Sequence, residues 1–249
     1  MKLKLYSNQR KSIFIYLCGF FILFTTKTNA IIPQLDVVDT HTAITLPRAT
    51  YNLSFWGYEN GGILSKTVMG LSDGIYLGAS FDVQRAIGQE KPQFNIPGVI
   101  AKLRFTEGWE SFPLFIALGY DAYYTGRNID NELTLENRII YGPHFTITKP
   151  IFLLEGEQHF HIGCRTPVQP VQNPQDTEMY IGFDFPIGYF VPMIEVERIF
   201  FNSKRSKEVL VNAGFRFNIL EGLAIELNMM MGLKRKPSRM LVFEFMGYF

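Results

Sequence analysis

The sequence is poor in the residues on which disulfide-bonded, cysteine-ligated and nucleic-acid-binding proteins depend. It has two cysteines in 249 residues, Cys18 and Cys164, and Cys18 lies in a segment that we expect to be removed. A single remaining cysteine excludes an intramolecular disulfide and a cysteine-based metal site. Five of the 24 lysines and arginines lie in the first 30 residues, which contain no acid, so the rest carries 19 basic against 23 acidic residues. That balance offers no basic surface to nucleic acid.

The chain also lacks a long apolar run outside its N-terminus, which excludes a helical membrane protein. The first 30 residues combine a basic start, an apolar stretch from Ser12 to Thr26, and the small residues Thr28 and Ala30. This is the pattern of an export signal, and we predict a signal peptide over residues 1–30, cleaved after Ala30. An uncleaved anchor is the alternative, because the apolar stretch approaches the ~17 residues that can span a bilayer.

After residue 30, apolar and polar residues alternate along much of the chain. Ile75–Gln84 is the clearest case, with Leu77 and Phe81 on one face and Tyr76 and Asp82 on the other. A period of two is typical of β-strands with one apolar face. The alternation predicts twelve strands at 48–57, 62–71, 75–84, 98–106, 113–123, 138–148, 151–165, 178–185, 189–198, 208–219, 223–232 and 239–249.

The connections between these strands alternate in length. Short periplasmic turns and longer outer loops are typical of transmembrane barrels. The sequence therefore predicts an all-β fold, a transmembrane antiparallel up-and-down β-barrel over residues 48–249 with about 12 strands (range about 10–14). Pro143 and Pro192 fall inside predicted strands, so we expect bulges or strand ends there. The tight turns are predicted at 72–74, 148–150, 186–188 and 220–222, and the longer loops at 85–97, 124–137, 166–177, 199–207 and 233–238.

The C-terminus supports an outer-membrane location. Phe249 ends a strand whose other outward residues are Leu241, Phe243 and Phe245. A terminal aromatic on an alternating strand, behind an export signal, predicts an assembly signal at Phe249 that the barrel-assembly machinery would read. A soluble sandwich or lipocalin-like barrel, with the apolar face inward, is the alternative. The signal, Phe249 and the loop lengths favour the membrane barrel.

If the apolar faces meet lipid, the polar faces line the interior, since a charge facing lipid at the midplane costs about 2–4 kcal/mol. These side chains fit either ion pairs that fill a narrow barrel or a polar conduit, and about twelve strands favour the narrow or filled interior. The predicted lumen-lining residues are Asp82, Lys102, Arg104, Asp121, His144, His159, His161, Asp184, Glu195, Glu197, Arg216, Glu226 and Glu244.

The histidines do not predict a metal site or a catalytic centre. A hairpin centred on Lys149-Pro150 would place His144 opposite Glu155 and roughly 14 Å along the strand from His159. We therefore predict no metal, no cofactor and no catalytic residue. The alternative is an outer-membrane hydrolase acting on lipid or glycan. A barrel phospholipase would need a serine two residues beyond a histidine, and no histidine here has one.

Short elements between Asp39 and Gly126 resemble a family of bacterial outer-membrane barrels linked to exopolysaccharide production. The elements are Asp39-Thr40-His41-Thr42-Ala43, Trp109-Glu110-Ser111, Gly119-Tyr120-Asp121 and Thr125-Gly126, with His41 where the family has proline. The resemblance implies a barrel in an envelope-polysaccharide setting and assigns no catalytic residue.

The remaining segments leave alternatives open. Residues 31–47 could form a plug, a periplasmic arm or a disordered tail. Basic loops at 204–207 and 234–239 could face lipopolysaccharide or only solvent. Together these features predict a non-enzymatic narrow pore or structural envelope protein linked to exopolysaccharide export. Its expected partners are outer-membrane lipid, lipopolysaccharide, the barrel-assembly machinery and polysaccharide.

Overall fold

The computed structural model describes residues 32–108, 112–122, 140–153, 156–169, 177–199, 209–232 and 237–249. The predicted signal peptide and its cleavage site lie outside these residues. The same holds for the Trp109-Glu110-Ser111 and Thr125-Gly126 elements and for the basic segments 204–207 and 234–236. Within the described ranges, no helix is long and apolar enough to cross a membrane.

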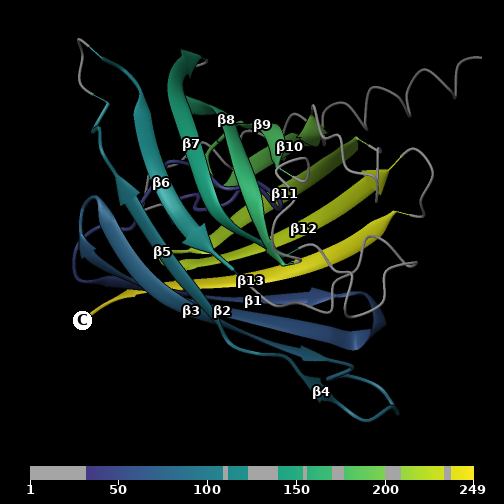
Figure 1. Cartoon of the computed structure of the whole chain (residues 1–249). Coiled ribbons are helices and arrows are strands. Elements are labelled where there is room, and N and C mark those ends of the chain that lie inside the picture. The colour runs from purple at the N-terminus through teal and green to yellow at the C-terminus, as the bar shows by residue number, and fades with distance from the viewer. Residues whose placement is uncertain are drawn as a thin grey trace, which may run out of the picture.

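Antiparallel strands wrap into a closed barrel (Figure 1). The two ends of the sheet meet because β1 pairs with β13, Phe55 opposite Phe243, and β2 pairs with both β1 and β3. β4 is a two-residue strand beside the end of β3, so twelve long strands form the wall, as the sequence predicted. The elements are β1 Thr50–Tyr58, η1 Glu59–Gly61, β2 Gly62–Ser72, β3 Ile75–Gln84, β4 Gln93–Phe94, β5 Gly98–Arg104, β6 Phe115–Asp121, β7 Ile140–Leu153, β8 Gly156–Gln169, β9 Glu178–Asp184, β10 Phe190–Ile199, β11 Leu210–Leu220, β12 Leu223–Gly232 and β13 Ser238–Tyr248.

Alternate residues of each strand face the outside and the interior, as the period of two requires. Phe81, Phe215 and Phe243 are 41–46% exposed, whereas Asp82 and Arg216 are 1% exposed. The apolar face is therefore the outer face of the barrel, and the charged face is turned to the axis. This excludes the soluble alternative, in which the phenylalanines would form a dry centre.

An arginine on the apolar face is expected to test this orientation. Phe215 lies in the middle of β11, so Phe215→Arg should lower the free energy of unfolding in lipid vesicles by about 2–4 kcal/mol. Val209→Arg is the matched control, because Val209 precedes β11 and an arginine near the membrane interface costs only about 0–1 kcal/mol. Equal effects in urea titrations of the two variants would contradict a lipid-facing β11.

The β7–β8 hairpin differs from the prediction. Leu153 pairs with Gly156, Pro150 pairs with His159, and His144 pairs with Arg165 rather than Glu155. The predicted turn at 148–150 is wrong, because β7 continues through Pro150. The last pair of β7 with β6 joins Thr148 to Phe115, so Pro150 lies beyond the end of β6. At such an edge the missing proline N–H leaves no hydrogen bond unmade.

The other proline predictions agree with the structure. The register of β7 against β8 shifts between Tyr141 and His144, which places Pro143 at a bulge. Pro192 is the third residue of β10, and pairing with β9 begins only at Met193. A proline in a barrel wall is tolerated at such irregularities and strand ends.

The start of β1 and the end of β13 lie side by side, with Thr50 opposite Tyr248. They lie at the end of the barrel that carries the tight turns. The backbone N–H of Phe249 donates to the carbonyl of Ala49 at 3.1 Å, and the Phe249 side chain is 72% exposed. The predicted role of Phe249 in assembly stays a prediction.

Candidate functional site

Residues 32–47 lie inside the barrel and form a hairpin-like loop, which we call the N-terminal loop. Its tip is closed by a hydrogen bond from Val37 N–H to Thr40 C=O (2.8 Å), and its limbs are joined by one from Thr42 N–H to Leu35 C=O (3.1 Å). The loop returns to the tight-turn end, where the Thr45 hydroxyl donates to the Asp73 carbonyl of the β2–β3 turn (2.6 Å). Thr40, Thr42, Ala43 and Leu46 are completely buried.

The carboxylate of Glu195 on β10 holds the tip of the loop. The backbone N–H groups of Val38, Asp39 and Thr40 donate to its two oxygens at 2.9–3.1 Å, and the Thr40 hydroxyl donates at 2.6 Å. Asn212 on β11 supplies a fifth donor at 2.7 Å. Buried backbone N–H groups need acceptors, and an ionised acceptor makes the stronger bond. A single carboxylate of the wall thus accepts hydrogen bonds from all three of these backbone N–H groups.

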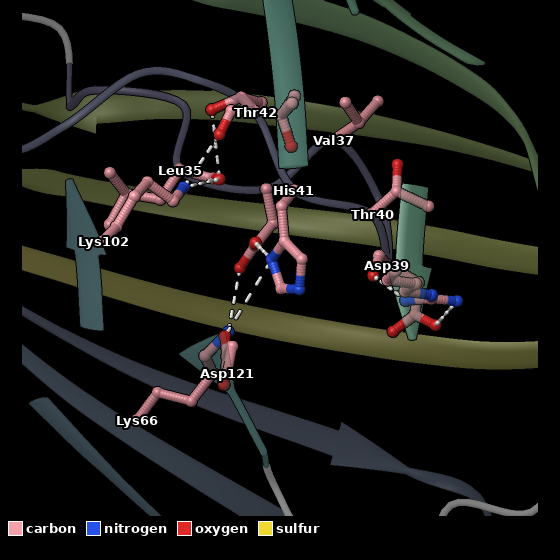
Figure 2. A network of polar contacts seen from close by, with 12 residues as sticks. Leu35, Val37, Asp39, Thr40, His41, Thr42, Lys66, Lys102 and Asp121 are labelled. Atoms are coloured by element: carbon pink, nitrogen blue, oxygen red, sulfur yellow. Dashed lines mark hydrogen bonds and ion pairs between the residues drawn. The ribbon is translucent and has the colours of Figure 1, made fainter. Parts of the chain in front are cut away.

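Two lysines hold the limbs of the loop (Figure 2). The Lys66 ammonium lies 2.9 Å from carboxylate oxygens of both Asp36, on the loop, and Asp121, on β6. Lys102 donates to the carbonyls of Thr42 at 2.9 Å and Leu35 at 3.3 Å. The loop is therefore bound by cations from two strands.

His41 occupies the centre of this region (Figure 2). Its Nδ1 is 2.8 Å from Asp36 Oδ1, and its ring stacks on His144 of β7 with centroids 3.8 Å apart. Burial lowers the pKa of His41 although Asp36 favours the charged form. Burial opposes ionisation of Asp36, but Lys66, followed by His41, holds the Asp36 pKa well below its usual value.

These two shifts predict that acid loosens the loop. A released His41 would regain its usual pKa near 6.5, so the released loop binds more protons, and docking weakens as the pH falls below about 6.5. Protonation of Asp36 also weakens docking, but only below about pH 3.9, the usual pKa of an aspartate. The groups that face His41 are Asp36, Asp121, Lys102 and His144, and Lys66 contacts both of these aspartates.

Hydrogen exchange of the Val38, Asp39 and Thr40 amides should therefore speed up between about pH 7 and about pH 5, beyond its intrinsic pH dependence. His41→Gln is the control, since glutamine does not titrate, and it should flatten this change. Exchange that follows only the intrinsic dependence would contradict the role of His41.

One group among the described residues has the ligand spacing of a metal site. Side-chain atoms of Asp36, His41 and Asp121 lie within 4.8 Å of one another. The Lys66 ammonium already contacts both carboxylates, so their negative charge has a cation partner within the protein. We assign no metal to this group.

Two arginines connect the wall to the loop backbone. Arg165 on β8 pairs with Glu178 and Glu197 and donates to the Asp39 carbonyl at 3.0 Å. Arg216 on β11 donates to Glu226 at 2.6 Å, to Glu244 at 2.8 Å and to the Ile32 carbonyl at 3.3 Å. Each guanidinium thus joins two carboxylates and one loop carbonyl, which uses its fixed fork of donors.

A histidine network lies near the tight-turn end. His161 contacts Asp184 through Nε2 (2.7 Å) and the Thr148 hydroxyl through Nδ1 (2.8 Å), and His159 contacts Asp184 at 3.0 Å. A hydroxyl, an imidazole and a carboxylate in series also occur in nucleophilic catalysis. Thr148 and His161 are fully buried, and the Thr148 hydroxyl accepts the N–H of Ala43 from the loop. The arrangement has no access for a substrate while the loop is in place.

The structure places most of the predicted lumen residues on the buried inner face. Asp82, for example, accepts a hydrogen bond from the Tyr58 hydroxyl at 2.8 Å. Arg104 and His159 are only half-buried, and Arg104 donates to the Asp73 carbonyl at the rim. The buried members of the predicted set are Asp82, Lys102, Asp121, His144, His161, Asp184, Glu195, Glu197, Arg216, Glu226 and Glu244.

Sequence reasoning missed Lys66, Arg165, Glu178 and Arg198 among the buried charges. Arg165 and Glu178 stand at or next to the predicted strand ends, where the facing of a side chain is hardest to assign. Arg198 has a positive φ of 62° at a register shift of β10, and this bulge turns it inward beside Glu197. The alternation itself gives no sign of such a bulge.

Comparison with known proteins finds likeness in structure only. No protein-family model and no curated protein matches the sequence. A solved structure of KdgM porin superposes with a TM-score of 0.52 at 8% identity, covering 79% of this chain and 98% of that one. KdgM porin in complex with disordered oligogalacturonate gives a TM-score of 0.52 at 6% identity, with the same coverage. At these identities the likeness shows the fold alone, a closed antiparallel β-barrel like that of a porin.

Proposed function

We propose that this protein is an outer-membrane channel whose pathway is closed by its own N-terminal loop. The observation that carries the proposal is that residues 32–47 fill the inside of a closed, porin-like barrel and are held there by Glu195. Solutes would pass when the loop leaves the interior.

The wall does not need the loop in order to stay closed. The β1–β13 and β2–β3 pairings that complete the ring join strand residues only. Loop release would therefore break side-chain and tip contacts but no ladder hydrogen bond of the barrel.

The loop is nevertheless stabilised strongly enough to make openings rare. Val37 and Val38 pack with Trp56 and Leu64, and Ile32, Leu35 and Leu46 belong to a second buried apolar cluster. Burying a side chain of this size contributes about 1.5–3 kcal/mol. We therefore expect a mostly closed channel with brief openings.

A reversible tether tests the proposal on the full mature chain. A Cβ at Gly182 of β9 would lie 3.4 Å from the Cβ of Val37, close to the ~3.5–4.5 Å found in disulfides. Val37→Cys with Gly182→Cys, in a Cys164→Ala background, should show openings in planar bilayers when reduced and none when oxidised. The background with Val37→Cys alone, which cannot form the tether, is the control. Equal conductance of the oxidised and reduced tether protein would contradict closure by the loop, and silence of both would contradict a channel.

A link to exopolysaccharide export is part of this proposal and is supported by the resemblance of the short elements between Asp39 and Gly126. Oligogalacturonate is the ligand of the KdgM complex and forms no part of this proposal. The apolar outer face would contact outer-membrane lipid. Export, cleavage after Ala30 and assembly through Phe249 remain part of the proposal.

A hydrolase acting on lipid or glycan is the second candidate. The series Thr148–His161–Asp184 favours it. The burial of Thr148 under Ala43 disfavours it. Thr148→Ala separates the two, because a hydrolase would lose turnover, whereas a channel would keep the conductance of each opening and open more often, since Ala43 N–H loses its acceptor.

A further inference from the structure

We infer that the barrel, once its N-terminal loop has left, passes small cations in preference to anions. This inference rests on the proposed channel function and names the class of solute. It follows from the charges that the strands themselves place inside the barrel.

The strands carry more buried acids than buried bases. Among the described residues they contribute eight buried carboxylates and five buried cations, a formal excess of three negative charges. The acids are Asp82, Asp121, Glu178, Asp184, Glu195, Glu197, Glu226 and Glu244, and the bases are Lys66, Lys102, Arg165, Arg198 and Arg216.

The acids are distributed along the length of the barrel. Glu178 and Asp184 are the first and last residues of β9, so they lie at opposite ends of one strand. Glu195 lies in the middle of β10. A cation would therefore meet carboxylates at both ends and at the centre of the pathway.

Release of the loop changes the partners of these groups unequally. Arg165 keeps Glu178 and Glu197, Arg216 keeps Glu226 and Glu244, and Lys66 keeps Asp121. Lys102 loses the two loop carbonyls that it contacts.

Glu195 loses four of its five donors and keeps Asn212. Loop release thus frees a central carboxylate in a net negative interior. Walls of low dielectric constant strengthen the field of such charges and concentrate ions of opposite sign. A barrel of about twelve strands is narrow, so the solutes would be small.

The reversal potential of the channel openings in a KCl gradient tests the inference. The reduced form of the tether protein should give a potential whose sign shows a several-fold preference for K⁺ over Cl⁻. Glu195→Lys in this background should remove most of that preference, because it replaces the central negative charge with a positive one. Glu90→Lys makes the same charge change on the exposed connection after β3 and should leave the preference unchanged.

The outcomes separate this inference from the function on which it rests. Openings that prefer Cl⁻ would overturn cation preference and leave the channel in place, and an equal effect of the two lysine substitutions would overturn the assignment of the preference to Glu195. Silence of the reduced protein would overturn both. If Glu195→Lys fails to fold, the sign of the potential in the unsubstituted tether protein still decides the inference.

Discussion

Replacing Arg216 with methionine is expected to lower the free energy of unfolding by about 3–5 kcal/mol, because it removes one partner of a buried charge network. Arg216 is 1% exposed and is the shared partner of Glu226 and Glu244. Without the guanidinium, two carboxylates would face each other in the interior with no cation between them. Urea unfolding in detergent micelles, followed by tryptophan fluorescence, measures the change.

The matched control removes the whole network rather than one partner. Arg216→Met combined with Glu226→Gln and Glu244→Gln leaves no uncompensated charge, so most of the lost stability should return. Equal destabilisation of the single and triple variants would mean that packing of the Arg216 stem, not its charge, is what the barrel needs.

The sequence predicted the wall of the barrel well because alternation reports directly on facing. Phe81 and Asp82 are neighbours in β3, and their exposures of 41% and 1% follow the period of two. Alternation does not determine which residues pair across neighbouring strands. The β7–β8 register depended on where β7 ends, and Pro150 is compatible with either a turn or an edge position. Pro150 can continue β7 because β6 begins at Phe115, opposite Thr148, and so does not reach Pro150. Alternation does not show at which residue β6 begins.

The interior could be predicted less well, because it contains a loop with no periodic pattern. Leu64 and Val68 share a face of β2 with Lys66, so alternation alone does not show which face of this strand points inward. In the structure all three point inward, since Leu64 packs on Val37 and Val38 of the loop while Lys66 pairs with Asp36. An apolar residue that faces the axis can be predicted only if the loop that packs on it is known.

Glu195→Gln is expected to increase the fraction of open channels about 100-fold. Hydrogen bonds to a charged group contribute about 1.5–3 kcal/mol each. They are not additive, so we expect the loss of charge to weaken docking by about 3 kcal/mol in all, and each 1.4 kcal/mol is about tenfold in an equilibrium. Glutamine keeps the size of the side chain, but its amide group presents N–H donors to the N–H groups of Val38, Asp39 and Thr40.

Glu197→Gln is the control for the effect of charge on conductance, because Glu197 lies two residues further along the same strand. It accepts hydrogen bonds from Arg165 and Asn212, which belong to the wall. Single-channel recordings should therefore show a large rise in open probability for Glu195→Gln and a small change for Glu197→Gln. Because both variants lose one interior carboxylate, an equal rise would assign the effect to the interior charge. A rise for Glu195→Gln alone requires the hydrogen bonds that Glu195, and not Glu197, accepts from the N–H groups of the loop tip.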